Sequence, residues 1–288
     1  MENENTETKV KKKSKKVLWI VLGSIAGALA LAALIIFLVI PGVQYFQAKS
    51  AIKKGDYIAA YNKLVALEEF WDSPEVIDEI YNKYLVQKLQ GSKVGDTVFF
   101  GNYEQDNVTG NGKEAIEWIV LEKQDDKALV ITKYALDCIA YNSEFASSSW
   151  ETCTLRPWLN ETFMNEAFEK DDLELILTTT VTAENNPLFS TDPGQDTQDK
   201  LFLLSINEAE KYGADRTLLQ CPPTQYAIKK RIEVYEDTGN CRWWLRSPGL
   251  NPSDASAVGG YGYIYTQGNY VFFRFYGVRP AMWIDLTK

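Results

Sequence analysis

The chain has 288 residues, of which 45% are hydrophobic and 24% charged, and these fractions exclude a globally disordered or low-complexity protein. It contains no histidine, which excludes catalytic triads with an imidazole base, histidine-ligated zinc and histidine proton shuttles. The formal net charge is −9, and it is unevenly placed. Residues 1–16 carry six lysines against three glutamates, a balance of +3, which leaves −12 for the rest of the chain. The acidic remainder argues against nucleic acid or another polyanion as a partner.

An uncharged apolar run of 24 residues follows the basic tail, over residues 17–40, and Pro41-Gly42 ends it. As a helix this run would be about 36 Å long, enough to cross a hydrocarbon core of about 30 Å. A cleaved signal peptide is the alternative, but its apolar region is usually about 7–15 residues long and precedes a small-residue cleavage site. The run has no such site, so we expect a retained transmembrane helix.

The lysines before the run outnumber those that follow it, so the positive-inside rule places residues 1–16 in the cytoplasm. The remainder then lies outside the cell, as part of a single-pass protein of the cell membrane.

Helical patterns follow over residues 41–91. Asp56 is a candidate N-cap for a helix over residues 57–67, and Ser73-Pro74 begins another that Gly91 closes. The spacing resembles a degenerate tetratricopeptide-like helical hairpin. Since such arrays usually need about three repeats, a short stalk that packs on itself competes with a peptide-binding repeat.

Residues 92–288 show strand patterns with a few helices, and we expect one extracytoplasmic domain of the α+β class with mixed, mostly antiparallel sheets. Helices are expected at 154–168 and after the capping box Ser205-x-x-Glu208, and a long loop at 183–199. Strands are expected at 97–101, 115–121, 127–132, 201–205 and 281–286, with a hairpin that pairs 260–265 with 270–275.

Four cysteines follow the apolar run: Cys138, Cys153, Cys221 and Cys241. An even number in an oxidising compartment favours disulfides, and sequence proximity favours the pairs 138–153 and 221–241 among the three pairings. A metal–thiolate site or a catalytic pair is the alternative, but the sequence has no C-x-x-C spacing and no histidine base.

No cofactor is expected, because the chain lacks a P-loop, a Rossmann fingerprint and a G-x-S-x-G elbow. Asp192, Asp196 and Asp199 are weak candidates for calcium ligands, although they do not match the EF-hand pattern. A solvated polar loop is the alternative.

Aromatic side chains make up 13% of the chain and are the main candidates for ligand contacts. Rings can stack on sugars or peptides, or they can pack in the core and in cross-strand ladders. Both interpretations stay open for Trp243, Trp244, Tyr261, Tyr263 and Tyr265.

Three segments carry a family resemblance: Val94–Gln105 with Ile116–Leu121, Trp150–Asn160, and Trp243–Gly249 with Gly277–Ile284. Together they resemble an uncharacterised domain of bacterial surface proteins, mainly from Firmicutes, which has no established activity. The last pair, W-W-L-R-S-P-G and G-V-R-P, is also distantly similar to formylglycine-generating-enzyme-like domains, which implies a C-type-lectin-like fold. The copper-binding cysteine pair of that enzyme has no counterpart here, since no cysteine follows the tryptophans.

Two arginines stand within these motifs, Arg246 and Arg279, each amid apolar residues. The five donors of a guanidinium can tie loop carbonyls or a carboxylate together, or they can contact a ligand.

Three functions are compatible with this sequence. The first is a membrane-anchored binding module for a cell-wall glycan, a peptide or a protein, which the missing catalytic motifs favour over an enzyme. The second is an enzyme on a formylglycine-generating-enzyme-like scaffold, with copper and free thiols. The third is a structural or assembly protein that acts through the stalk and the membrane helix.

Overall fold

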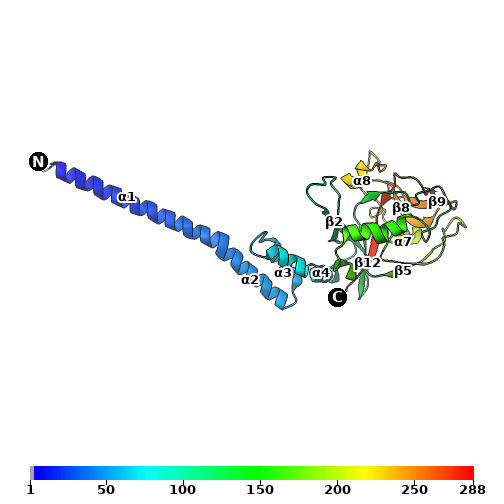
Figure 1. The fold of residues 1–288 in the computed structure, drawn as a ribbon, viewed down its shortest axis with the longest axis horizontal. Helices are drawn as coiled ribbons and strands as arrows, with labels where there is room; N and C mark the ends of the chain where they lie inside the picture. Colours follow the sequence, from blue (N-terminus) through cyan, green and yellow to red (C-terminus); the bar gives the residue numbers. More distant parts are fainter. Residues whose placement is uncertain (1–2) are drawn as a thin grey trace. The chain divides into compact units, whose positions relative to one another are not determined.

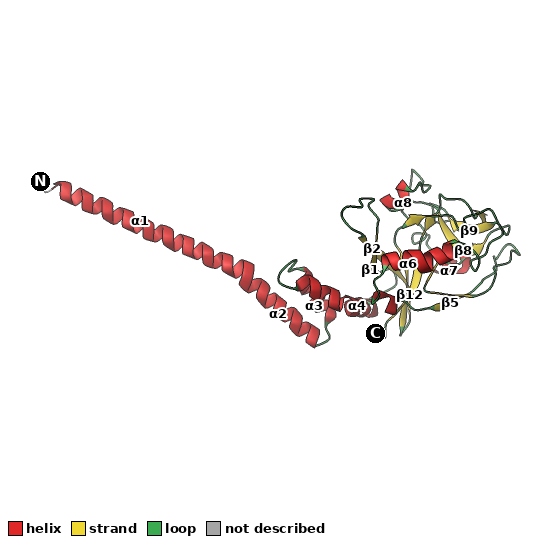
Figure 2. Ribbon diagram, viewed as in Figure 1, coloured by secondary structure: helices red, strands yellow, loops and turns green. Residues whose placement is uncertain are grey.

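The computed structural model describes residues 3–288, with side chains from residue 17 onward. The chain forms two compact units, one that ends at Tyr84 and one from Leu85 to Lys288 (Figure 1). The first unit is helical, and the strands lie in the second (Figure 2). The chain is therefore of the mixed α+β class, as predicted.

The N-terminal helix is continuous from α1 (Asn3–Leu34) through a π-helical turn (Ile35–Val39) into α2 (Ile40–Lys53). The apolar run ends at Pro41, but the helix does not: the π-helical turn directly precedes Pro41, and such an irregular turn accommodates a proline inside a continuous helix. The helix Val17–Lys53 is long and apolar enough to cross a membrane, with a mean hydropathy of 2.6 over an 18-residue window, and it is the one such helix among the described residues.

Two further helices follow, α3 (Tyr57–Val65) and α4 (Ser73–Gly91). The Asp56 carboxylate accepts the Ala59 N–H at 3.0 Å, which confirms the predicted N-cap. A small core joins α2, α3 and the start of α4; its most buried members are Ala48, Ala60, Leu64 and Val76. The boundary between the two units falls inside α4, so the last turns of this helix belong to the second unit.

The first sheet of the second unit has the strand order β1-β2-β3-β12-β7, and all its neighbours are antiparallel. Its strands are β1 (Thr97–Tyr103), β2 (Glu114–Lys123), β3 (Lys127–Thr132), β12 (Ala281–Asp285) and β7 (Leu201–Phe202). These positions confirm the five strands that the sequence predicts outside the C-terminal hairpin, although β7 is shorter than expected.

The second sheet has the order β10-β9-β8-β11-β4, with one parallel pair between β11 and β8. Its strands are β10 (Ile264–Tyr270), β9 (Asp254–Val258), β8 (Trp243–Pro248), β11 (Gly277–Val278) and β4 (Asp137–Cys138). The remaining strands, β5 (Thr179–Val181) and β6 (Thr197–Asp199), form a separate antiparallel pair.

The predicted C-terminal hairpin is wrong. Strand β10 runs through the expected turn at 267–269 and pairs with β9, while residues 259–263 turn the chain and residues 271–276 are irregular. Gly268, with φ of +69°, lies where the β9–β10 register shifts, so this glycine marks a bulge within the strand and not its end.

Short helices complete the second unit. The predicted helix over 154–168 consists of α5 (Leu155–Pro157), a π-helical segment (Trp158–Phe163) and α6 (Met164–Ala167). A 3₁₀ turn (Asp172–Glu174), α7 (Ile206–Tyr212) and α8 (Gln225–Lys229) follow. Ser205 and Glu208 form the predicted capping box at the start of α7.

Candidate functional site

The motif tryptophans lie in the core. Trp243 and Trp244 in β8 are fully buried, and their indole N–H groups donate to the carbonyl oxygens of Leu219 (2.9 Å) and Ile139 (3.1 Å). The Trp244 ring also stacks on Tyr276 at a centroid distance of 4.0 Å. Both side chains therefore serve packing, since no ring face or polar atom is left for a ligand.

The motif arginines tie distant segments together. Arg246, 5% exposed, donates to both carboxylate oxygens of Glu208. Arg279, 1% exposed, donates to the carbonyl oxygens of Thr132 (2.8 Å) and Leu218 (2.7 Å). Arg246 is ion-paired and Arg279 bonds backbone carbonyls, so both buried side chains hold distant segments together.

Asp199 collects three hydrogen bonds inside the second unit. Its carboxylate accepts from Trp150 Nε1 (2.9 Å), from Arg156 Nε (2.7 Å) and from the Thr197 hydroxyl (2.5 Å). The side chain is 1% exposed, so it joins the segment after β4 to β6 and is not available as a calcium ligand.

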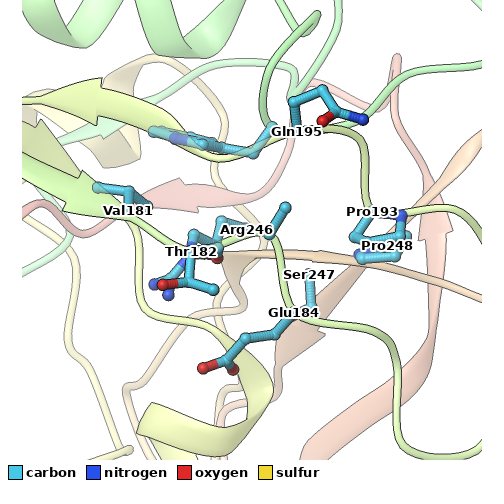
Figure 3. A pocket seen from close by; sticks show the side chains of 10 residues that line it. Val181, Thr182, Glu184, Pro193, Gln195, Arg246, Ser247 and Pro248 are labelled. Carbon is cyan, nitrogen blue, oxygen red and sulfur yellow. Dashed lines mark hydrogen bonds between the residues drawn. The ribbon is translucent and has the colours of Figure 1, made fainter.

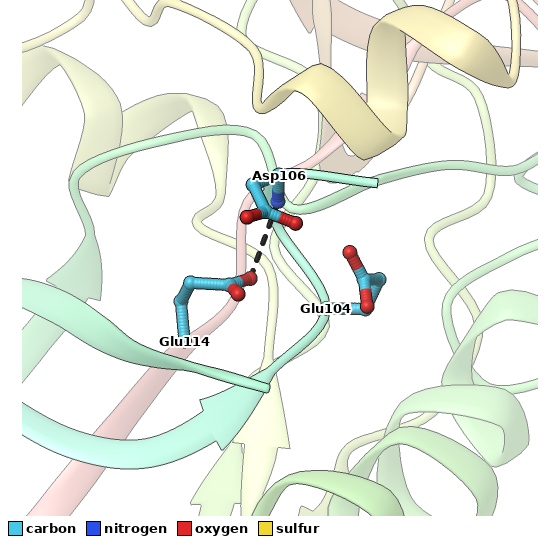
Figure 4. Close-up of side chains that lie close together, drawn as sticks. All are labelled: Glu104, Asp106 and Glu114. Atoms are coloured by element: carbon cyan, nitrogen blue, oxygen red, sulfur yellow. Dashed lines mark hydrogen bonds between the residues drawn. The ribbon is translucent and has the colours of Figure 1, made fainter. Parts of the chain in front are cut away.

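The carboxylates of the other two calcium candidates accept hydrogen bonds from backbone N–H groups. Asp192 accepts the Gly194 N–H and Asp196 accepts the Ala183 N–H. The one carboxylate cluster with metal-ligand spacing among the described residues is elsewhere, at Glu104, Asp106 and Glu114 (Figure 4).

Backbone donors fill this acidic cluster. Glu114 accepts the N–H of Asp106 at 3.2 Å, and Glu104 and Asp106 both accept the Val108 N–H. Hydrogen bonds from Asn111 and Val108 hold the pKa of Asp106 below its usual value. The cluster thus closes the exposed loop between β1 and β2.

All four cysteines are buried free thiols, and the structure brings two of them together. The Cys241 N–H and thiol both point to the Cys221 carbonyl oxygen, at 2.8 and 3.2 Å. Burial opposes ionisation of Cys221, but a hydrogen bond from the Cys241 thiol and the charge of Arg279 leave its pKa below the ordinary value. The two residues are neighbours in the fold, and their pairing in a disulfide stays a prediction.

The other two thiols have separate partners, since Cys138 donates to the Arg274 carbonyl and Cys153 to the Trp150 carbonyl. Burial raises the pKa of each to about 12, so both are unreactive in the folded unit.

A shallow cleft, open to solvent, lies between β8 and the loop after β5 (Figure 3). Its lining residues are Trp150, Val181, Thr182, Ala183, Glu184, Pro193, Gln195, Arg246, Ser247 and Pro248. The Glu184 carboxylate accepts the Ser205 hydroxyl at 2.7 Å, and the donors of Arg246 are engaged as described. The charged groups that line the cleft are therefore all engaged within the protein.

The three candidate tyrosines are exposed, unlike the buried tryptophans Trp243 and Trp244. Tyr261 and Tyr263, 42% and 50% exposed, lie in the turn between β9 and β10, and Tyr265, 39% exposed, lies at the start of β10. Tyr235 joins them, with its ring 5.2 Å from that of Tyr261 in an edge contact. We call these four side chains the tyrosine platform.

Two glycines make room for the platform. A Cβ atom on Gly259 would lie 2.4 Å from the Tyr265 ring, and one on Gly260 would lie 2.6 Å from the Tyr235 ring. Both rings therefore lie directly against the backbone. Such rings are oriented before any ligand arrives, which lowers the entropy lost on binding.

Polar groups surround the platform. The Tyr261 hydroxyl donates to the Asp237 carboxylate at 2.5 Å, and the Arg216 guanidinium lies 4.2 Å from the centre of the Tyr263 ring. Arg242 donates from Nε to the Tyr235 hydroxyl at 2.7 Å. The hydrogen bond to Asp237 raises the pKa of Tyr261, so its hydroxyl stays protonated at neutral pH.

A family model described as Domain of unknown function (DUF6273) matches residues 125–286. The chain belongs to this family. Neither a curated protein nor a solved structure matches the chain.

The family segment contains the tyrosine platform and the buried arginines, whereas the acidic cluster precedes it. It begins just before β3, so the sheet partners β1 and β2 lie outside the matched residues. Sequence reasoning missed Tyr235 and the neighbouring Arg216 and Arg242, because these residues come from loops that only the fold brings together. The Gly259-Gly260 pair beside three alternating tyrosines was the available signal.

Proposed function

We propose that the chain is a single-pass membrane-anchored module, with its second unit outside the cell, that binds a glycan of the cell envelope through the tyrosine platform. The observation that carries the proposal is the group of four neighbouring tyrosine rings, three of them exposed, of which Tyr235 and Tyr265 lie against glycine backbone. The motif tryptophans and arginines, by contrast, are committed to the core.

The chemistry of the platform favours a neutral sugar chain. The C–H faces of a pyranose ring pack on aromatic faces, and its hydroxyl groups need donors and acceptors beside the ring. Asp237 and Arg216 stand beside Tyr261 and Tyr263 and offer both kinds of group. The acidic charge beyond the apolar helix disfavours a polyanionic ligand.

The membrane part of the proposal rests on the apolar helix and on the excess of lysines before it. The resemblance to surface proteins of Firmicutes supports the same location. Strands β1 and β12 share one sheet, as the resemblance to C-type-lectin-like folds would require.

A binding assay tests the proposal. The full chain in nanodiscs is mixed with insoluble peptidoglycan and with a panel of polysaccharides, and the bound fraction is measured. Truncation of an aromatic residue at the centre of an interface commonly costs more than about 1 kcal/mol, and about 1.4 kcal/mol is a factor of ten in affinity. We therefore expect Tyr261→Ala and Tyr263→Ala each to weaken glycan binding about tenfold.

Phe99→Ala is the matched control, because Phe99 is also an exposed aromatic residue but lies on β1, away from the platform. Equal losses for the control and the platform variants would contradict the proposal. So would an absence of binding to every glycan tested.

A further inference from the structure

A short hairpin beside the tyrosine platform has a cysteine at its base. Val234 and Cys241 pair as an antiparallel β-bridge. Next to this bridge, the Tyr235 N–H donates to the Asn240 carbonyl oxygen at 2.8 Å. The turn that joins the two sides is exposed. We call residues 233–241 the platform hairpin.

The platform hairpin supplies two side chains to the ligand surface. The Tyr235 ring lies against Gly260, and Asp237 accepts the Tyr261 hydroxyl at 2.5 Å. Arg242, directly after the hairpin, donates to the Tyr235 hydroxyl at 2.7 Å. The tyrosine platform is therefore complete only while the hairpin keeps its place.

Cys241 holds the base of the hairpin against Cys221. Its N–H and its thiol both point to the Cys221 carbonyl oxygen, so the two cysteines are neighbours. A disulfide between them would enclose residues 222–240, which include Tyr235 and Asp237. Such a cross-link removes open conformations of the enclosed segment, and its effect grows with the length of the closed loop.

A buried cation stands beside this pair of thiols. Arg279 is 1% exposed and forms no salt bridge with a carboxylate among the described residues. Burial opposes ionisation of both thiols, but a hydrogen bond from Cys241 and the charge of Arg279 leave the pKa of Cys221 below its ordinary value. The thiolate is the species that attacks a disulfide, so Cys221 is the better nucleophile of the pair.

We propose that Cys221 and Cys241 form a reversible disulfide that locks the platform hairpin and so controls the tyrosine platform. The inference rests on the proposed function of the platform and adds its regulation. Because both sulfur atoms are buried, the exchange takes place when the hairpin opens locally.

The exchange uses an external disulfide, such as oxidised glutathione. The Cys221 thiolate attacks one of its sulfur atoms, which forms a mixed disulfide and releases one thiol. The Cys241 thiolate then attacks the Cys221 sulfur and releases the second thiol. The two cysteines are oxidised, the external disulfide is reduced to two thiols, and the two cysteine protons pass to the leaving thiolates.

Peptide mapping and hydrogen exchange of the full chain in nanodiscs test the lock. The chain is prepared once with dithiothreitol and once with oxidised glutathione, and unreduced tryptic digests are analysed by mass spectrometry. In the oxidised chain we expect peptide 217–229 to be linked to peptide 232–242. Amide exchange at residues 233–241 should slow about tenfold or more on oxidation, because a cross-linked loop opens less often.

Binding to insoluble peptidoglycan tests the control of the platform. An open hairpin withdraws Tyr235, and one central aromatic contact is commonly worth about tenfold in affinity. The oxidised chain should therefore bind about tenfold more tightly than the reduced chain.

Two variants assign the effect to this pair of cysteines. Cys221→Ser/Cys241→Ser should exchange and bind as the reduced chain does under both conditions. Cys138→Ser is the matched control, because Cys138 is also a buried thiol but donates to the Arg274 carbonyl. This control should keep the full response to oxidation.

A missing linked peptide would overturn the inference, as would a linked peptide without slower exchange at 233–241. Equal peptidoglycan binding by the oxidised and reduced chains would overturn the control of the platform. Slower exchange in a chain that binds no glycan in either state would instead contradict only the proposed ligand, so the two failures are distinguishable.

Discussion

Replacement of Asp199 is the sharpest test of how the second unit is held together. Its carboxylate accepts hydrogen bonds from an indole, a guanidinium and a hydroxyl, and it is almost completely buried. Asp199→Ala would leave the Trp150 N–H and the Thr197 hydroxyl without an acceptor and Arg156 without its counter-ion.

The expected loss can be estimated from the two buried donors, because Arg156 is 27% exposed and water can hydrate its charge. A buried donor left without an acceptor costs about 1–3 kcal/mol, so the Trp150 N–H and the Thr197 hydroxyl together cost about 2–6 kcal/mol. Each kcal/mol shifts the melting temperature by roughly 2–4 °C for a unit of 150–250 residues. A central value of about 4 kcal/mol therefore predicts a melting temperature lower by roughly 8–16 °C.

Tryptophan emission during heating of the full chain in nanodiscs measures this shift, because six of the eight tryptophans belong to the second unit. Asp199→Asn keeps one acceptor oxygen but loses the ion pair, so we expect a smaller shift. Asp196→Ala is the matched control from the same loop, since Asp196 is exposed and accepts a single backbone N–H. A shift for Asp199→Ala no larger than that of Asp196→Ala would refute the reasoning.

Three further outcomes are expected. Hydrogen bonds from Lys211 and Tyr212 hold the pKa of Glu122 in the folded chain at about 2, below the ordinary 4.5. The contribution of Glu122 to stability is therefore complete above pH 4.5 and is lost as the pH falls through about 2. The acid unfolding curve of Glu122→Gln should lack this pH-dependent loss. Arg246→Met should destabilise the second unit by about 3 kcal/mol in urea unfolding, and a second change, Glu208→Gln, should recover part of the loss, because the partner carboxylate is then neutral. Cys221 and Cys241 are in contact and lie in the compartment that we expect to be oxidising, so we expect a disulfide between them. Thiol titration of the unfolded, unreduced chain should then detect two thiols, and a count of four would contradict the disulfide.

Local patterns in the sequence were sufficient for much of the fold. The apolar helix, the N-cap at Asp56, the capping box at Ser205 and the strands of the first sheet were all predicted. Each of these depends on neighbours a few residues apart, through hydrophobic periodicity or a side chain that caps its own helix.

The C-terminal hairpin was not predictable in the same way. Alternating tyrosines and a glycine at 268 favour a strand and then a turn, but the strand β9 that pairs with β10 was not recognised, and a bulge replaces the expected turn. Register is decided by long-range pairing and by which face is buried, and local propensity does not contain that information.

The sequence by itself established the apolar helix, the acidic remainder, the missing histidine and the aromatic candidates. Only the tertiary structure decided which candidates are available to a ligand. Trp243 and Arg246 are enclosed because β8 lies inside its sheet, between β9 and β11, whereas Tyr261 and Tyr263 stay exposed because they lie in the turn that leads into the edge strand β10. Aromatic residues look alike in the sequence, and their role depends on which strands come to cover them.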